Sequence, residues 1–282
     1  MLLGTAGTGT TWGILSSLRE SFPGTYVVAM DMSPARLIAA SAVADRFEQT
    51  PAVADDSFPP LLLEVIDDAA VDTYVPTFDP EIILGATLRE QGRLAGVTCT
   101  APPSWSAALC WDKLELALWM EDRGIPSPTT RPALELASAD GGWIAKPRRG
   151  VGSVGVHRVT DEAELSTLRR RDDLGEVIVQ ALLPGPELTV DAFLAGDRRG
   201  SAICRERIEV KSGVCTKARI FHDELVESTV LDLGRALELR GAFCVQVMWD
   251  GKTWRRAAKL SPSAPPPVTA RNRDLNQRQD DH

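Results

Sequence analysis

Short apolar runs alternate with amphipathic stretches over the first hundred residues, and this alternation is the strongest constraint on the fold. It predicts strands at 27–30 and 73–76 and helices at 34–44, 61–67 and 80–91. A strand and helix order at this spacing favours parallel strands joined by right-handed crossovers, with helices covering the sheet. We therefore expect an α/β N-terminal domain with a doubly wound sheet.

The pattern changes after residue 100, where a proline-rich segment at 101–104 interrupts the chain. A helix is predicted at 111–123, because Gly124 and two following prolines would end it there. Beyond it the sequence predicts two strands within 142–159, strands at 177–181, 187–194, 201–210 and 244–249, and helices at 161–171 and 224–239. We expect this half to be α+β, with mostly antiparallel strands.

Composition and charge exclude several classes of protein. The 282 residues include 39 acidic and 31 basic ones, a net charge of −8, and no Lys/Arg-rich run, so nucleic acid is not an expected partner. The longest apolar runs are far shorter than the roughly 20 residues that cross a bilayer, and no signal-peptide pattern is present. The five cysteines are widely spaced and form no C-x-x-C pair, which argues against disulfides and zinc. We expect a cytoplasmic protein with no membrane partner.

The C-terminal residues differ in composition from the rest. Three consecutive prolines follow Ala264, and almost no apolar residue comes after them. Such a segment buries too little surface to offset the entropy lost on ordering. We expect residues 264–282 to form a disordered tail.

A glycine-rich loop lies near the N-terminus. Residues 4–13 read GTAGTGTTWG and precede a helix predicted at 14–20. Such a loop can bind a dinucleotide phosphate at a helix N-terminus, with Asp31, about 20 residues on, accepting a ribose hydroxyl. The glycines are also explained by close packing of a strand against a helix. This second interpretation is favoured because a lone pattern of this kind is weak.

A second glycine-rich segment carries more information. In residues 143–156, WIAKPRRGVGSVGV, a predicted strand ends in Lys146 and a basic turn follows before a strand resumes. The turn contains Arg148, Arg149, Gly150, Gly152, Ser153 and Gly155. Free backbone N–H groups, a hydroxyl and several cations suit a polyphosphate. An ordinary hairpin with solvated charges explains the segment about equally well.

Two further segments indicate where the rest of a nucleotide would lie. The strand predicted at 177–181 carries Gln180 and leads into an apolar turn, whose backbone groups can face an adenine edge. The next strand begins with Glu187, which can accept hydrogen bonds from ribose hydroxyls. Upstream, Asp112 and Lys113 lie at the start of a predicted helix.

Taken in order, four strings resemble the ATP-grasp superfamily, in particular the branch similar to the large chain of carbamoyl-phosphate synthase. They are DKLELALWMEDRGIPSPTT, WIAKPRRGVGSVGV, VIVQALLPGPELTVDAFL and RERIEVKSGVCTKARI. The N-terminal strings MLLGTAGTGTTWGILSSLRE and VVAMDMSPA resemble the Rossmann-like domain that precedes the ATP-grasp domain in this branch. The resemblance implies a Rossmann-like domain at 1–108 and an α+β ATP-grasp domain at 109–263, with a lid subdomain near 125–183.

The resemblance also implies a reaction and a set of roles. ATP would phosphorylate a small carboxylate, and an amine, a thiol or ammonia would attack the acyl phosphate. Lys113 and Lys146 would contact the ATP phosphates, and Glu187 the ribose. The lid would be Arg148–Gly155, with Gly150, Gly152 and Ser153, and the adenine would face Gln180, Ala181 and Leu183. Fixed cations offset the charge on a transferring phosphoryl group.

Two arginines are candidates for a catalytic role. Arg205 and Arg207 would contact the substrate carboxylate or the γ-phosphate of ATP. A solvated strand face, on which Glu206 and Glu209 also lie, explains them about equally well.

The expected magnesium site departs from the resemblance. Gln246 matches the first metal position, but where a Glu-x-Asn-Pro-Arg string is expected the chain has Lys259, Ser261, Pro262 and Ser263. Mg²⁺ needs several oxygen ligands, and a lysine reverses the charge at such a position. We therefore expect ATP as ligand, a defective Mg²⁺ site and severely impaired ligation.

Three explanations of this departure stay open. The chain is a frame-shifted or truncated product, it binds a nucleotide without catalysis, or it is a divergent enzyme whose metal is held by Gln246 and other residues. The change in composition at Ala257 favours the first. A Rossmann oxidoreductase that uses the first glycine loop is less favoured, because nothing downstream supplies an acid or base for hydride transfer.

Overall fold

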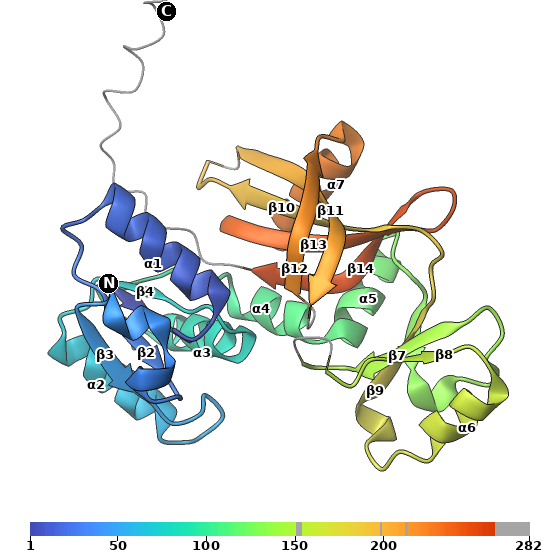
Figure 1. Cartoon of the computed structure of the whole chain (residues 1–282), viewed down its shortest axis with the longest axis horizontal. Coiled ribbons are helices and arrows are strands. Elements are labelled where there is room, and N and C mark those ends of the chain that lie inside the picture. Colours follow the sequence, from blue (N-terminus) through green and yellow to red (C-terminus); the bar gives the residue numbers. More distant parts are fainter. Residues whose placement is uncertain (151–153, 198, 212–213, 263–282) are drawn as a thin grey trace, which may run out of the picture.

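The computed structural model describes residues 1–150, 154–197, 199–211 and 214–262, so the predicted tail at 264–282 lies outside it. The described residues form three sheets. Figure 1 shows the sheet of the N-terminal residues at one end of the molecule, the sheet of residues 130–181 at the other end, and the sheet of residues 187–262 between them.

The N-terminal residues form a parallel sheet flanked by helices. Its strands are β1 (Leu2–Leu3), β2 (Val28–Asp31), β3 (Arg46–Gln49), β4 (Thr73–Val75) and β5 (Thr98–Cys99), in the order β3-β2-β1-β4-β5. The helices are α1 (Gly9–Ser21), α2 (Phe58–Asp68) and α3 (Asp79–Glu90). Neighbouring strands pair in parallel, which confirms the predicted doubly wound α/β fold.

The predicted helix at 34–44 is wrong. The segment forms two 3₁₀ turns, Ala35–Leu37 and Ala39–Ala42. Between them Ile38 has an extended backbone, with φ −114° and ψ 109°, and its side chain is buried in the core beside the sheet. The Ser41 hydroxyl also donates to the carbonyls of Ala35 and Ile38, which competes with helical hydrogen bonds. Burial of Ile38 therefore outweighs continuation of the helix.

The helix predicted at 111–123, with Asp112 and Lys113 at its start, is α5 (Lys113–Asp122). The helix before it, α4 (Ser104–Trp111), was not predicted; it ends at Asp112. Asp112 has an extended backbone, and its carboxylate accepts hydrogen bonds from the N–H groups of Leu114 and Glu115. Aspartate is a favourable N-cap residue, so a second helix starts here.

A four-stranded antiparallel sheet follows. It contains β6 (Thr130–Pro132), β7 (Trp143–Pro147), β8 (His157–Val159) and β9 (Val177–Ala181), in the order β6-β9-β7-β8. Helix α6 (Glu162–Arg169) and the 3₁₀ turns Ala133–Glu135 and Leu174–Glu176 complete this unit. The strand predicted at 177–181 is confirmed, whereas β6, a short strand that ends in a proline, was not predicted.

The remaining strands form a larger antiparallel sheet. They are β10 (Glu187–Leu194), β11 (Gly200–Lys211), β12 (Val214–Phe221), β13 (Gly241–Trp249) and β14 (Trp254–Pro262), in the order β12-β11-β10-β13-β14. Helix α7 (Glu224–Ala236) packs on β10 and β11. The antiparallel pairing confirms the predicted α+β character of this half.

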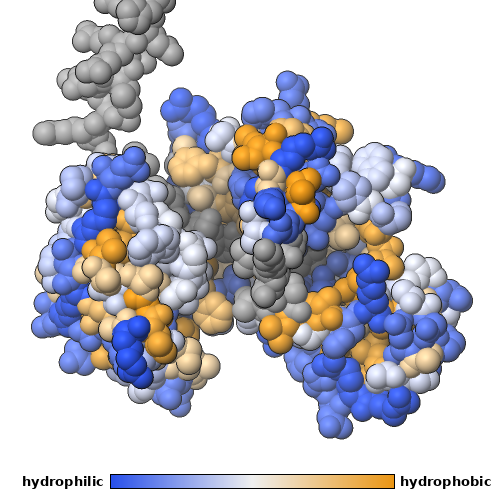
Figure 2. Space-filling view, viewed as in Figure 1, coloured by the Kyte–Doolittle hydropathy of each residue, from blue (hydrophilic) through white to orange (hydrophobic). Residues whose placement is uncertain are grey.

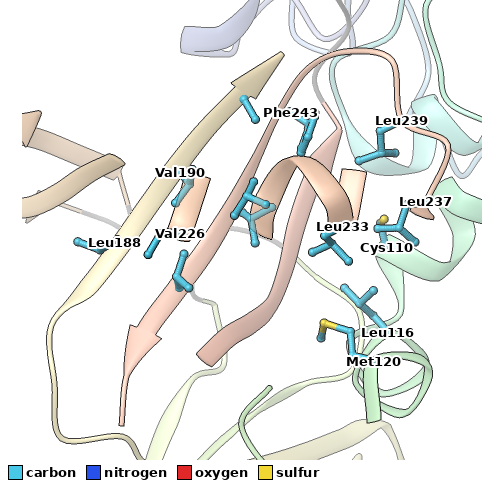
Figure 3. Close-up of a cluster of buried hydrophobic side chains, with 14 of the residues drawn as sticks. Cys110, Leu116, Met120, Leu188, Val190, Val226, Leu233, Leu237, Leu239 and Phe243 are labelled. Carbon is cyan, nitrogen blue, oxygen red and sulfur yellow. The ribbon is translucent and has the colours of Figure 1, made fainter. Parts of the chain in front are cut away.

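One hydrophobic cluster joins the larger sheet to helices α5 and α7. Val190 of β10 and Phe243 of β13 pack with Leu233 of α7 and with Leu116 and Met120 of α5, as Figure 3 shows. Burying each such side chain contributes roughly 1.5–3 kcal/mol. The cluster therefore holds β10 and β13 firmly, and these strands carry two of the predicted site residues.

Polar residues dominate the surface. Figure 2 shows hydrophilic side chains over most of the face in view, with apolar residues in small groups. Among the helices in the described part of the chain, none has the length and apolar character needed to span a bilayer.

Candidate functional site

A cavity of about 470 Å³ lies between the two antiparallel sheets. It is lined by residues from α5, from β7 and the turn after it, from β8 and β9, and from β10, β11 and β13. Eight predicted site residues meet here: Lys113, Lys146, Gly150, Gln180, Leu183, Glu187, Arg207 and Gln246. Residues up to 135 positions apart in the chain thus contribute to one space, as 113 and 248 do.

The cavity is strongly basic although the protein is acidic. Its described lining includes the cations Lys113, Lys146, Arg158 and Arg207 but only one carboxylate, that of Glu187. The whole chain carries a net charge of −8. A concave surface with a local excess of positive charge attracts anions, so the cavity suits a polyanionic ligand.

Part of the cavity lining is apolar. Ile144, Leu182, Leu183 and Met248 belong to it. Small-molecule sites commonly combine such apolar walls with a few polar groups. Leu182 and Met248 were not predicted as site residues, although the apolar turn after β9 was.

Lys146 and Gln180 form a hydrogen-bonded chain at the floor of the cavity. The Lys146 ammonium donates to Gln180 Oε1 at 2.8 Å, and Gln180 Nε2 donates to Thr130 Oγ1 at 3.0 Å. Gln180 is 4% exposed. Its amide thus holds the ammonium group in place, because the amide itself is fixed by Thr130.

The turn from 182 to 186 is clamped between the sheets. Leu182 N–H donates to the Gly142 carbonyl at 3.0 Å, and Gly185 N–H donates to the Trp249 carbonyl at 3.0 Å. Ala181, by contrast, is absent from the described lining, and its N–H donates to the Thr129 carbonyl at 2.9 Å. Of the residues predicted to face an adenine, Gln180 and Leu183 therefore line the cavity and Ala181 lies beside it.

We expect Gly185→Ala to destabilise this turn. An added Cβ would lie 2.5 Å from both Cβ and the carbonyl oxygen of Trp249, so the backbone would have to shift. Such overpacking typically costs about 1–3 kcal/mol. Urea unfolding of the variant measures the loss. Gly175→Ala is the matched control, because a Cβ there would meet nothing within 4 Å, and equal effects of the two substitutions would contradict the prediction.

The two predicted catalytic arginines lie in different places. Arg207 lines the cavity and forms an ion pair with Glu187 across β11 and β10. Arg205, two residues earlier on the same strand face, pairs with Asp191 through two hydrogen bonds of 2.9 Å and is not part of the described lining. The structure thus places one of the two arginines at the cavity.

The predicted residues of the basic turn after β7 also lie in different places. Gly150 lines the cavity, whereas Arg148 and Gly155 are absent from its described lining. Arg148 instead pairs with Asp112 and Glu115. The predicted residues Gly152 and Ser153 lie outside the described part of the chain.

The donor set around Gln246 does not match magnesium. Gln246 lies opposite Thr189 of β10, and the β13–β14 pairing is irregular between Val245 and Val247. Among the described residues, no group of three or more His, Cys, Asp or Glu side chains could hold a metal ion. The described lining offers one carboxylate, Glu187, which Arg207 neutralises. Mg²⁺ prefers several oxygen ligands, often carboxylates, so these residues do not fit it.

The first glycine-rich loop is held by side chains of its own domain. Both carboxylate oxygens of Asp31 accept backbone N–H groups, one from Gly7 and one from Ser33, each at 2.8 Å. A Cβ on Gly4 would lie 1.8 Å from Glu81, which shows how closely helix α3 approaches the loop. These contacts favour the packing interpretation of the glycines over a dinucleotide site.

Comparisons with known proteins agree with this geometry. The sequence matches the family described as ATP-grasp domain over residues 110–254, and the family described as PylC-like, N-terminal domain over residues 2–100. No curated protein sequence gives a significant match.

Several solved structures share the fold at low sequence identity. N5-carboxyaminoimidazole ribonucleotide synthetase from Thermus thermophilus is 16% identical with a TM-score of 0.70, and the match covers 93% of this chain and 71% of that one. L-amino acid ligase from Bacillus licheniformis is 16% identical with a TM-score of 0.71, covering 93% and 66%. The ADP complex of N5-carboxyaminoimidazole synthetase from Staphylococcus aureus is 16% identical with a TM-score of 0.71, covering 95% and 70%. Because the ATP-grasp match spans more than half of the sequence, this chain belongs to the ATP-grasp family.

Proposed function

We propose that this protein binds ATP in the cavity between its two antiparallel sheets. The observation that carries the proposal is the meeting of four cations and an apolar wall in one cavity of an otherwise acidic chain. A polyphosphate matches the cations and a purine ring matches the wall. Among similar structures, one synthetase from Staphylococcus aureus is described as complexed with ADP.

The geometry supports a role for each part of the cavity. Lys113 and Lys146 would contact the phosphates, Leu182 and Leu183 would pack on the adenine, and Glu187 would accept a ribose hydroxyl. The ion pair with Arg207 orients Glu187 for this. We assign residues 1–108 and 109–263 to the two domains, with the lid subdomain near 125–183.

The reaction we propose is that of a carboxylate–amine or carboxylate–ammonia ligase, weakened in this chain. ATP would phosphorylate a small carboxylate bound near Arg207, and the acyl phosphate would then be attacked by the amine. The residues around Gln246 do not fit Mg²⁺, and the sequence places Lys259 where a carboxylate would be needed. The free cysteines in the structure suit the reducing cytoplasm, which is the location we propose.

Titration of the purified protein with ATP, followed by a hydrolysis assay, tests this function. We expect saturable ATP binding that ADP competes with, and no turnover above background. Absence of ATP binding would refute the nucleotide site. Robust turnover would refute the impairment while leaving the nucleotide site in place.

A double substitution separates a damaged ligase from a non-catalytic nucleotide-binding protein. Lys259→Glu with Ser261→Asn restores the two oxygen-bearing residue types of the expected metal string, and we expect Mg²⁺-dependent ATP hydrolysis to rise by about tenfold or more if the rest of the site is intact. Lys252→Glu, an equal charge reversal in the exposed turn between β13 and β14, is the matched control. ATP binding without any gain in turnover would favour the non-catalytic alternative.

A further inference from the structure

Asp112 lies at the junction between the start of α5 and the basic turn that follows β7. It is 4% exposed, and it lies directly before Lys113, which lines the cavity. Its carboxylate takes part in two sets of contacts. One set caps α5, through N–H groups of Leu114 and Glu115 at 3.2 Å each.

The second set joins the same carboxylate to two consecutive arginines. Arg148 Nε donates to both oxygens of Asp112, at 2.7 and 2.8 Å, and Arg149 Nη2 donates to one of them at 2.8 Å. Arg148 also donates to Glu115 at 2.7 Å. Burial on its own would raise the pKa of Asp112, but the hydrogen bonds from Arg148 and from the backbone of Glu115 hold it below its ordinary value.

Backbone contacts reinforce this junction. Lys113 N–H donates to the Arg148 carbonyl at 3.1 Å, and the Lys113 ammonium donates to the Gly150 carbonyl at 3.0 Å. The turn is held from its other side, because Arg148 N–H donates to the Glu176 carbonyl at 2.8 Å. The positions of Lys113 and Gly150 at the cavity thus depend on how the turn is anchored to α5.

The two arginines face away from the proposed nucleotide. Arg148 and Arg149 line a separate, open depression of about 460 Å³ with Trp105 and Trp111, and neither belongs to the described lining of the nucleotide cavity. Both arginines therefore form ion pairs with carboxylates, Arg148 with Asp112 and Glu115 and Arg149 with Asp112, instead of facing a phosphate. Of the four cations that line the cavity, Lys113 lies on the α5 side of this junction, and Lys146 precedes the turn on β7.

We propose that Asp112 is a positioning residue that anchors the turn at 148–150 to α5 and thereby makes the cavity select nucleoside polyphosphates over nucleosides. The phosphate end is built from Lys113 and Gly150, both attached to Asp112 through this junction. The adenine end is built from Leu182, on the turn after β9, and Met248 of β13, and both residues lie outside this junction. This inference rests on the proposed nucleotide site.

Asp112→Asn separates anchoring from capping. Asparagine is an equally good N-cap, so α5 keeps its start, but the amide loses the charge that pairs with the two arginines. We expect the Kd for ATP to rise about tenfold while the Kd for adenosine stays within about twofold. Asp223→Asn is the matched control: Asp223 caps α7 by accepting from Val226 N–H at 3.0 Å, and in the described part of the chain its other hydrogen bonds are with Glu227 rather than with an arginine.

Titrations of both variants with ATP and with adenosine decide the selectivity. Equal weakening of the two ligands by Asp112→Asn would show a merely structural role, and unchanged affinities would show no role. Either result overturns the proposal. So does an equal loss of ATP affinity in Asp223→Asn.

Tryptic cleavage gives a readout that needs no ligand. Trypsin cuts after Arg148 and Arg149, and mass spectrometry identifies these cuts. We expect them to form about tenfold faster in folded Asp112→Asn protein than in the unaltered and Asp223→Asn proteins, because cleavage follows local opening. Unchanged cleavage would refute the anchoring. If the unaltered protein binds no ATP, the proposed function and the selectivity both fall, and the cleavage rates still decide the anchoring.

Discussion

Lys146→Met is expected to raise the Kd for ATP by about 10- to 100-fold, since a hydrogen bond to a charged group contributes about 1.5–3 kcal/mol. Methionine keeps the length and apolar stem of the side chain, so the packing of β7 is preserved. What is lost is the ammonium that Gln180 holds at 2.8 Å on the floor of the cavity. Isothermal titration of the variant with ATP measures the effect.

The matched control for this experiment is Lys217→Met. Lys217 lies on β12, pairs with Glu209 at 2.8 Å and has a side chain that is 72% exposed, outside the described lining of the cavity. We expect its substitution to leave the Kd within about twofold, because exposed ion pairs contribute little. If both variants bind ATP as the unaltered protein does, with unchanged melting temperatures, the cavity is not the nucleotide site.

Strands in which apolar residues dominate or alternate with polar ones could be predicted closely. β9 matches its predicted residues 177–181, and β10 matches 187–194, because apolar residues dominate the first and alternate in the second, with prolines between them. Some strands of mixed composition could not. β3 is a half-buried stretch, Arg46–Gln49, whose charges pair locally, and its strand conformation comes from pairing with β2.

The start of α5 at Asp112 had a local signal. The spacing of Asp112 and Glu115 is that of a capping box, and this pattern predicts a helix start. Helix α4 was not predicted, because its residues follow directly on the proline-rich segment that was interpreted as a break. What no local pattern contains is the use of the Asp112 carboxylate by Arg148 and Arg149, since they come from a turn more than thirty residues away.

The residues of the candidate site could be predicted from the sequence, but the ion pairs that they form could not. Eight of the predicted residues line one cavity, and they come from α5, from five strands of the two antiparallel sheets and from the turns after β7 and β9. Which arginine reaches the cavity depends on the register of β10 and β11, in which Leu188 is opposite Glu206. Charges alternate on β11, so the residue types alone fit either arginine, and the register places Arg207 beside Glu187.

A buried carboxylate in the N-terminal domain makes the stability of the protein depend on pH. Glu81 is 0% exposed, and its two oxygens accept hydrogen bonds from the Tyr74 hydroxyl at 2.7 Å and the Thr5 hydroxyl at 2.8 Å. Burial raises the pKa of Glu81 from 4.5 to about 7, although these hydrogen bonds and one from the Thr77 backbone oppose the rise. Asp31, the other nearby carboxylate, raises it further.

The sign of the effect follows from proton binding in the two states. Between pH 4.5 and about 7 the folded protein keeps a proton on Glu81 that the unfolded chain has released. The contribution of Glu81 to the free energy of unfolding is therefore fully present below pH 4.5 and is lost as the pH rises through about 7. The change corresponds to a free energy of unfolding that is about 3 kcal/mol lower at alkaline pH.

Glu81→Gln is expected to abolish this loss. Glutamine cannot ionise, so the difference between the free energies of unfolding of the variant and of the unaltered protein should increase by about 2.5 kcal/mol from about pH 5 to about pH 8. Urea unfolding at the two pH values measures it. Taking the difference cancels the Met1 amine, whose pKa burial lowers, and Glu64→Gln on the exposed face of α2 is the control. A difference that does not change with pH, or one that Glu64→Gln reproduces, would show that the buried carboxyl group is not the source, because only a group with different pKa values in the folded and unfolded states can change stability with pH.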